Sequence, residues 1–139
     1  MLKKTFVWAL SLIFILNAST AIAENSQSSL IGTWQLVDGW VITDDGEIQY
    51  DLQAITSRKI LNRNDFAFVS RKNGQFWAAS TGQYRVEGNQ YSEIPQLLSY
   101  PIEDGTIYVF TFRLQGDDWF TERYANGKLV EREHWRRLR

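Results

Sequence analysis

Residues 107–138 read IYVFTFRLQGDDWFTERYANGKLVEREHWRRL, and this stretch predicts three consecutive β-strands joined by tight turns. Near its beginning, large apolar side chains occupy every second position and therefore lie on one face of a strand. These alternating residues are Tyr108, Phe110, Phe112 and Leu114. Turns are predicted at Gly116-Asp117-Asp118 and at Asn126-Gly127, because Asn-Gly readily adopts the positive φ angles of two-residue hairpin loops. Strands joined by such short turns pair antiparallel.

The residues before this stretch show the same organisation of short alternating segments and polar turns. Further strands are predicted within the ranges 34–42, 55–61, 66–71, 76–86 and 91–94. With about eight strands, the chain belongs to the all-β class as either a sandwich or a single antiparallel up-and-down β-barrel. We favour the barrel, because closing the sheet removes both exposed edges and about eight strands just enclose one small ligand.

The N-terminus has the organisation of a cleavable signal peptide. Met1 to Lys4 is basic, Phe6 to Leu16 is almost entirely apolar, and Ala21-Ile22-Ala23 presents small residues to a signal peptidase. The apolar run is too short for a transmembrane helix. We therefore expect a signal peptide over 1–23 with cleavage after Ala23, a flexible leader over 24–29 and one barrel domain over 30–139. The expected location is the bacterial periplasm or the medium, with no membrane insertion after cleavage.

Composition excludes several classes of function. Hydrophobic residues make up 44% of the chain, which excludes global disorder, and no cysteine is present for disulfides or thiolate metal sites. A formal net charge of −1 gives no field that would attract nucleic acid. The single histidine, His134, shares a strand face with Arg132 and Arg136, which indicates solvent rather than a haem ligand or a metal site. We predict no metal, no cofactor and no nucleic-acid partner.

Motifs spread along the chain resemble one protein family. They are Gly32-Thr33-Trp34, Arg58-Lys59-Ile60-Leu61 with Asp65-Phe66-Ala67-Phe68-Val69, Gly82-Gln83-Tyr84, Gly88-Asn89-Gln90-Tyr91-Ser92-Glu93, Gly116-Asp117-Asp118-Trp119 and Glu133-His134-Trp135-Arg136-Arg137-Leu138. Together they resemble the small bacterial secreted lipocalin-like domains, a family of largely unknown function. The resemblance implies a barrel whose cup holds an apolar or amphipathic molecule, and it implies no reaction. It also implies that Trp34 closes the narrow end of the barrel with Arg137 over its ring.

Candidate ligand-binding residues are aromatic side chains on the predicted strands together with two charged groups. They are Trp40, Arg58, Phe68, Trp77, Tyr84, Tyr91, Glu93, Tyr108 and Phe110. Such pockets hold a ligand by apolar area and orient it with a few polar contacts. Glu93 shares a strand face with Tyr91, so an inward Tyr91 brings Glu93 inward as well. A buried glutamate would be a ligand contact or would pair internally with Arg58 or Arg113, whereas an outward Glu93 would simply lie in water.

These observations favour an exported small-molecule binding protein over an enzyme. A second hypothesis is a small barrel enzyme that uses Glu93 and a tyrosine as an acid–base pair, which predicts a carboxyl group with a strongly shifted pKa beside a cavity. A third is a filled barrel that acts as an envelope interaction protein, which predicts no cavity.

Overall fold

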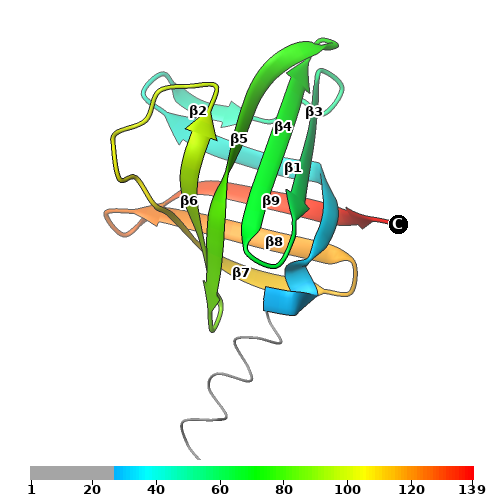
Figure 1. The fold of residues 1–139 in the computed structure, drawn as a ribbon. Coiled ribbons are helices and arrows are strands. Elements are labelled where there is room, and N and C mark those ends of the chain that lie inside the picture. Colours follow the sequence, from blue (N-terminus) through cyan, green and yellow to red (C-terminus); the bar gives the residue numbers. More distant parts are fainter. Residues whose placement is uncertain (1–26) are drawn as a thin grey trace, which may run out of the picture.

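The computed structural model describes residues 27–139 (Figure 1). The predicted signal peptide and residues 24–26 of the predicted leader lie outside the described residues. Residues 27–30 form one helical turn, and a single nine-stranded sheet follows. The strands are β1 (Gly32–Thr43), β2 (Gly46–Gln49), β3 (Ile55–Leu61), β4 (Asp65–Lys72), β5 (Gln75–Glu87), β6 (Gln90–Leu98), β7 (Tyr108–Gln115), β8 (Asp118–Ala125) and β9 (Lys128–Leu138).

Eight of these strands close into an antiparallel up-and-down barrel, which confirms the predicted fold class. From β3 to β9 each strand pairs with the next, and β1 closes the barrel by pairing with both β3 and β9. The ninth strand, β2, was not among the strands expected from the sequence. It forms a hairpin with the second half of β1, on the edge of β1 that the pairing with β3 leaves unused. Within residues 27–139, no helix is long and apolar enough to cross a membrane.

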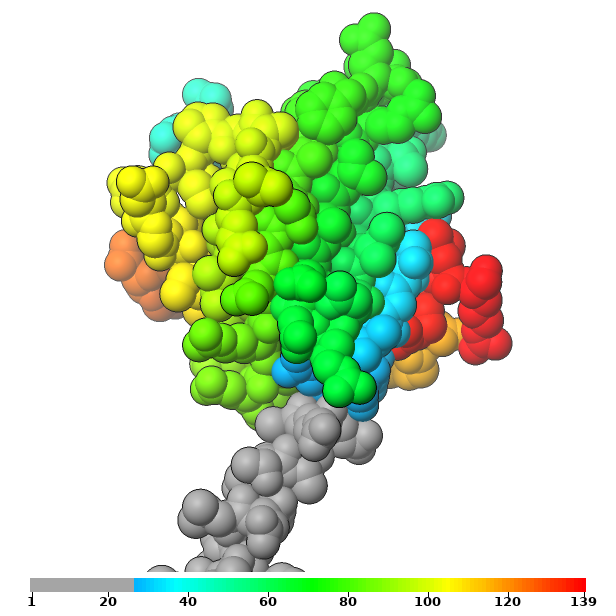
Figure 2. Space-filling view, viewed as in Figure 1, coloured from blue at the N-terminus to red at the C-terminus, as the bar shows by residue number. Residues whose placement is uncertain are grey.

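The two Asn-Gly turns have the predicted backbone conformation. Asn73 and Asn126 have φ angles of 52° and 51°, and the glycines that follow have φ angles of 77° and 74°. Positive φ at both central residues matches the right-handed twist of the flanking strands. The hairpin of β4 and β5 that contains Asn73 projects beyond the rest of the molecule (Figure 2).

Aromatic side chains fill the end of the barrel nearest the helical turn. Trp119 has its ring centre 5.3 Å from that of Trp34 and 5.1 Å from that of Tyr91, with the rings edge to face in both pairs. The indole Nε1 of Trp34 donates to the backbone carbonyl of Leu30 at 2.9 Å, and Leu30 itself is fully buried. This end of the barrel is therefore closed, and any ligand space must lie in the other half.

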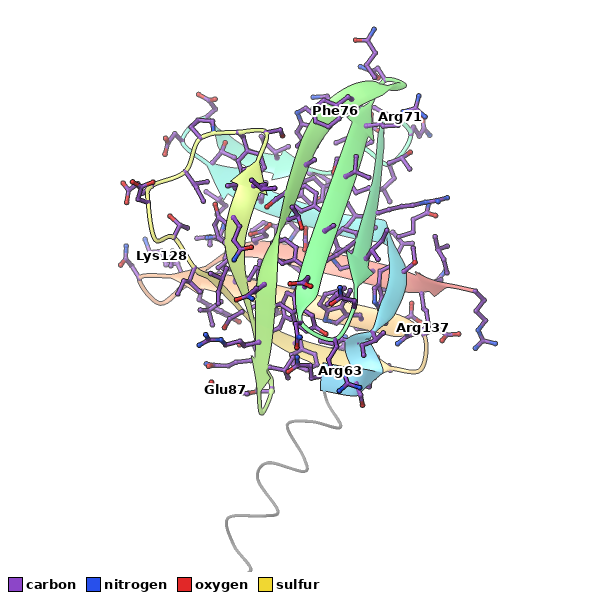
Figure 3. All side chains as sticks on the ribbon, in the orientation of Figure 1. Arg63, Arg71, Phe76, Glu87, Lys128 and Arg137 are labelled. Carbon is purple, nitrogen blue, oxygen red and sulfur yellow. The ribbon has the colours of Figure 1, made fainter. Side chains whose placement is uncertain are left out.

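Arg137 lies over the ring of Trp34 at the closed end, as the lipocalin-like resemblance implies. Its guanidinium carbon lies 4.1 Å from the ring centre of Trp34, a cation–π contact. The same guanidinium donates to the carbonyls of Ile31 at 2.7 Å and Ser29 at 2.6 Å. It thereby ties the last strand to the segment that precedes the first one. In Figure 3, Arg137 lies near this helical turn, whereas Phe76 and Arg71 mark the opposite end.

A β-bulge in β1 changes which of its side chains face the interior. Leu36 and Asp38 pair with consecutive residues of β9, so Val37 is an extra residue on β1. Leu36 points inward before the bulge, and the odd-numbered Val41 points inward after it. Trp40, which unbroken alternation predicts on the inner face, therefore lies on the outside, where it lines a surface groove.

Candidate functional site

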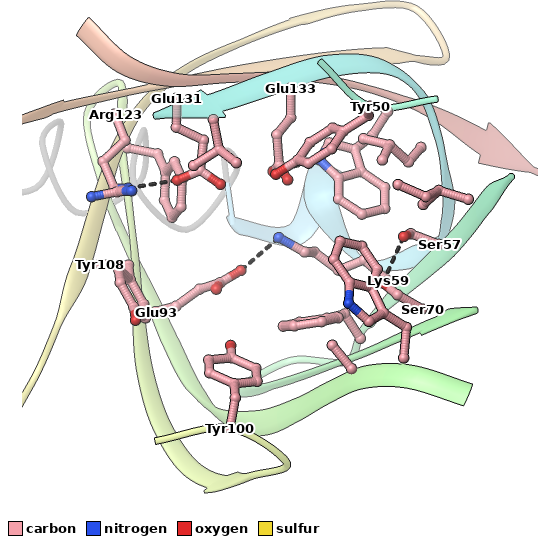
Figure 4. A pocket seen from close by; sticks show the side chains of 18 residues that line it. Tyr50, Ser57, Lys59, Ser70, Glu93, Tyr100, Tyr108, Arg123, Glu131 and Glu133 are labelled. Atoms are coloured by element: carbon pink, nitrogen blue, oxygen red, sulfur yellow. Dashed lines mark hydrogen bonds and ion pairs between the residues drawn. The ribbon is translucent and has the colours of Figure 1, made fainter. Parts of the chain in front are cut away.

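A cavity of about 400 Å³ occupies the half of the barrel away from Leu30. The strands contribute to it mainly from the halves that lie beyond the aromatic cluster, and Tyr50 and Tyr100 add side chains from the connections. The lining residues are Leu36, Val41, Tyr50, Ile55, Ser57, Lys59, Phe68, Ser70, Trp77, Ala78, Glu93, Tyr100, Tyr108, Phe110, Arg123, Glu131, Glu133 and Trp135. Apolar and aromatic walls thus surround a small set of charged groups (Figure 4).

At the floor of the cavity a buried ion pair joins two strands. The ammonium nitrogen of Lys59 lies 2.7 Å from Oε1 of Glu93, and both side chains are almost completely buried. The hydroxyl of Tyr91 donates to the same Glu93 oxygen at 2.8 Å. Glu93 therefore faces inward beside Tyr91, as their shared strand face predicts. A carboxylate so buried is stable only because both contacts satisfy its charge.

The partner of Glu93 differs from the two arginines that the sequence suggested. Across the turn from β3 to β4, Leu61 pairs with Phe66, and both are buried. This register turns Lys59 inward and Arg58 outward, because side chains alternate along a strand. Arg113 is also exposed, with its guanidinium carbon 3.8 Å from the ring centre of Phe120. The expected pairing with Arg58 or Arg113 is therefore corrected to Lys59.

Four aromatic rings surround the ammonium of Lys59. Its nitrogen lies 4.9 Å from the ring centre of Trp135 and 5.4 Å from that of Trp119, with Tyr91 and Phe110 within 6 Å. Burial by itself lowers the pKa of a lysine. Here the carboxylates of Glu93 and Glu133 outweigh burial, and the pKa of Lys59 is raised above its ordinary value. Lys59 is therefore protonated at neutral pH, and a protonated ammonium is unsuited to act as an amine nucleophile.

Two further glutamates face the cavity from β9. Glu131 accepts from Nε of Arg123 at 2.6 Å, and Glu133 accepts from Nε1 of Trp135 at 2.9 Å and from the Thr121 hydroxyl at 3.5 Å. Burial raises the pKa of both carboxyls, and the charge of Glu133 also contributes to the shift of Glu131, whose pKa reaches about 7. Each carboxyl is therefore harder to ionise than an exposed glutamate.

Three tyrosines line the cavity together with the charged groups. Burial raises the pKa of Tyr50, Tyr100 and Tyr108, that of Tyr100 to about 12, so all three remain hydroxyl donors at neutral pH. Gly39, opposite Glu133 in the pairing of β1 with β9, leaves room for one of them. A Cβ atom at this glycine would lie 2.9 Å from a ring carbon of Tyr50. The glycine thus allows the Tyr50 ring to lie beside Glu133.

The structure brings together five of the nine candidate residues at the cavity, namely Phe68, Trp77, Glu93, Tyr108 and Phe110. Tyr84 and Tyr91 belong to the closed core instead, where the Tyr84 hydroxyl donates to the carbonyl of Asn62 at 2.7 Å. Trp40 and Arg58 lie outside. Sequence analysis missed Lys59, Glu131, Glu133, Tyr50 and Tyr100. For the two glutamates a signal existed, since they share a strand face with the buried Trp135.

His134 lies on the outer face of the barrel, as its basic neighbours predict. Its ring stacks on Phe120 with ring centres 4.2 Å apart, and its Nε2 lies 2.6 Å from a carboxylate oxygen of Asp118. Within residues 27–139, no group of three or more His, Cys, Asp or Glu side chains could hold a metal ion.

The raised pKa of Glu131 predicts an unusual dependence of stability on pH. Its value in the unfolded chain is 4.5, so between about 4.5 and 7 the folded state holds a proton that the unfolded state lacks. The stabilisation is complete below about 4.5 and is lost as pH rises through about 7. We expect the free energy of unfolding of the wild type, measured with urea, to fall by about 1–3 kcal/mol from this source between about pH 5 and 8.

The Glu131→Gln variant should lose this part of the pH dependence, because glutamine does not titrate. Glu87→Gln, which changes an exposed residue, is the matched control and should keep the wild-type profile. Identical pH profiles for Glu131→Gln and the wild type would show that Glu131 ionises normally in the folded protein.

Comparison with known proteins assigns neither a family nor a function to the chain. No protein-family model matches the chain, and no curated protein matches it. Among solved structures, the crystal structure of Rv2717c from M. tuberculosis is similar, with a TM-score of 0.49 and 13% sequence identity over 83% of this chain and 96% of that chain. The assignment to a barrel rests on the strand pairing of this chain.

Proposed function

We propose that the protein is an exported carrier that binds one small amphipathic molecule in the barrel cavity and performs no reaction on it. The observation that carries this proposal is the cavity of about 400 Å³ in one half of the barrel. Binding sites for small molecules are concave, mostly apolar and of roughly 300–1,000 Å³, with a few polar groups that orient the ligand. The signal peptide predicted over 1–23 supports export, and the lipocalin-like resemblance supports a cup that binds ligands.

The cavity also bears on the alternatives considered from the sequence. A filled barrel predicts no cavity, and the cavity therefore disfavours a pure interaction protein. Acid–base catalysis by a carboxyl needs a pKa near the working pH, and Glu131 has a pKa of about 7, whereas Glu93 is held in the ion pair with Lys59. Acid–base chemistry at Glu131 is accordingly the second candidate function. It predicts turnover that Glu131→Gln abolishes while ligand binding persists.

Filling the cavity should prevent binding. Ala78 lines the cavity from the beginning of β5, so Ala78→Trp places a large side chain in the ligand space. We expect the neutral fluorescent probe N-phenyl-1-naphthylamine to bind the wild type saturably at one site, and its affinity for Ala78→Trp to fall by about tenfold or more, equal to about 1.4 kcal/mol. The measurement is fluorescence titration of both purified proteins.

Ala125→Trp is the matched control, because Ala125 is exposed at the turn between β8 and β9. It adds the same side chain outside the cavity and should leave probe binding unchanged. Equal affinity of all three proteins would place the probe on the surface, and the proposed binding cavity would lose its support.

A further inference from the structure

When all three carboxyl groups are ionised, above the pKa of about 7 of Glu131, the charges that line the cavity do not balance. Of the five charged side chains, Lys59 pairs with Glu93 at 2.7 Å and Arg123 pairs with Glu131 at 2.6 Å. Both cations of the lining are thus engaged, and Glu133 is the carboxylate in excess. Its two hydrogen-bond donors, the indole of Trp135 and the hydroxyl of Thr121, are both neutral. Its side chain points into the same space as Glu93 and Glu131 (Figure 4).

Lys59 acts as an internal probe of the potential in this space. Burial disfavours any charge, so a raised pKa for a buried acid does not by itself reveal the sign of the surrounding field. For a lysine, burial and a negative field act in opposite directions. The pKa of the buried Lys59 is raised because its partner Glu93 and, next, Glu133 outweigh the effect of burial. Glu93 is neutralised by Lys59, whereas Glu133 accepts hydrogen bonds only from neutral groups, so a cation beside Glu133 is favoured over an anion.

The walls have the composition that recognises organic cations. Seven of the lining residues are aromatic, and their ring faces carry partial negative charge that attracts an ammonium group. Lys59 already demonstrates this preference, since its ammonium lies among four rings. A second ammonium beside Glu133 would contact Trp135 and Tyr50. Lys59 would repel it little, because Glu93 neutralises Lys59.

We propose that the ligand is a small amphiphile with a cationic amine, whose ammonium group contacts Glu133 and Glu131 while its apolar part lies against Phe68 and Trp77. This inference rests on the proposed binding function and names the chemical class of the ligand. An anionic amphiphile such as a fatty acid would find both cations of the lining already paired and would face the excess charge of Glu133.

Proton release provides an independent signature of the cation. At about pH 6, below the pKa of about 7 of Glu131, the Glu131 carboxyl is largely protonated, and an ammonium placed beside it favours its ionisation. The other titratable or charged groups around the two β9 glutamates are Tyr50, Lys59, Glu93, Tyr100, Tyr108 and Arg123. The three tyrosines and Lys59 have raised pKa values, so these four groups stay protonated in this range. We expect up to about one proton released per bound cation near pH 6 and less near pH 8.

The experiment compares three amphiphiles that share a ten-carbon chain: decyltrimethylammonium, decanol and decanoate. Each competes with N-phenyl-1-naphthylamine for the full mature chain, and calorimetry in two buffers of different ionisation enthalpy gives the proton release. We expect decyltrimethylammonium to bind about tenfold or more tightly than decanoate. Glu133→Gln and Glu131→Gln, tested separately, should each weaken the cation about tenfold, leave decanol unchanged and reduce the proton release. The exposed Glu87→Gln is the control and should behave as the wild type.

Each other outcome has a distinct meaning. If decanoate binds as tightly as the cation, or if Glu133→Gln does not alter their ratio, the ligand class is wrong while the carrier function stands. If decanol binds and charge has no effect, the cavity recognises apolar area alone, and the inference again fails. If neither the probe nor any of the three amphiphiles binds, the proposed function fails together with the inference.

Discussion

Replacing Lys59 with methionine is expected to lower the free energy of unfolding by about 3–5 kcal/mol. The methionine fills a similar volume among the aromatic rings but leaves the Glu93 carboxylate buried without its cation. Glu93 retains only the hydroxyl of Tyr91, 2.8 Å away, which does not compensate a full negative charge. The midpoint of urea unfolding at neutral pH, compared with the wild type, measures the loss.

The double variant Lys59→Met/Glu93→Gln separates the charge from the packing. Because it removes both charges, it should be several kcal/mol more stable than the sum of the two single substitutions implies. Lys128→Met, at the exposed turn between β8 and β9, is the matched control and should change stability by less than about 0.5 kcal/mol. A Lys59→Met protein as stable as this control would mean that the buried ion pair is absent in solution.

Replacing Trp119 with alanine is expected to lower the free energy of unfolding by about 3–5 kcal/mol. Trp119 is 0% exposed and contacts Trp34, Tyr91 and Trp135 with ring centres 5.1–6.4 Å apart. Removing it leaves a hole in the centre of the closed end that these large rings cannot fill without breaking their own contacts. Urea unfolding followed by circular dichroism measures the change.

Trp77→Ala is the control for this prediction, since it removes the same side chain at a position that is 44% exposed. We expect it to cost less than about 1 kcal/mol. If both variants lost the same stability, the closed end would not be the centre of the core, and the assignment of open and closed halves would be wrong.

The fold was predictable because its signals are local. Alternation along Tyr108, Phe110, Phe112 and Leu114 is borne out by β7, whose even-numbered side chains are the more buried ones. The Asn-Gly turns at Asn73 and Asn126 required positive φ angles that few other residues adopt. Such signals need no knowledge of distant contacts, so the number and order of the barrel strands followed from them, apart from the short β2.

The site was less predictable because it depends on register and on pairing across the barrel. One extra residue at Val37 moved Trp40 to the outside. The only local mark of that bulge is Asp38, a charged residue that interrupts the alternation of apolar residues between Leu36 and Trp40. Lys59 was overlooked in favour of Arg58, since a lysine faces the interior only when a carboxylate on another strand neutralises it. That partner, Glu93, is 34 residues away in the sequence. The sequence shows that Glu133 lies on the same strand face as Trp135, because the two are two residues apart. It does not show that this face of Glu133 is buried.

Native mass spectrometry of the protein purified without detergent tests the central claim most directly. The wild type should have a mass above that of the bare chain, and the excess should disappear on denaturation because a bound small molecule is released. Otherwise it should bind one equivalent of N-phenyl-1-naphthylamine when the probe is added. Ala78→Trp, with its cavity filled, should do neither. A wild-type chain that remains bare under both conditions would contradict the account of the barrel as a carrier of small molecules.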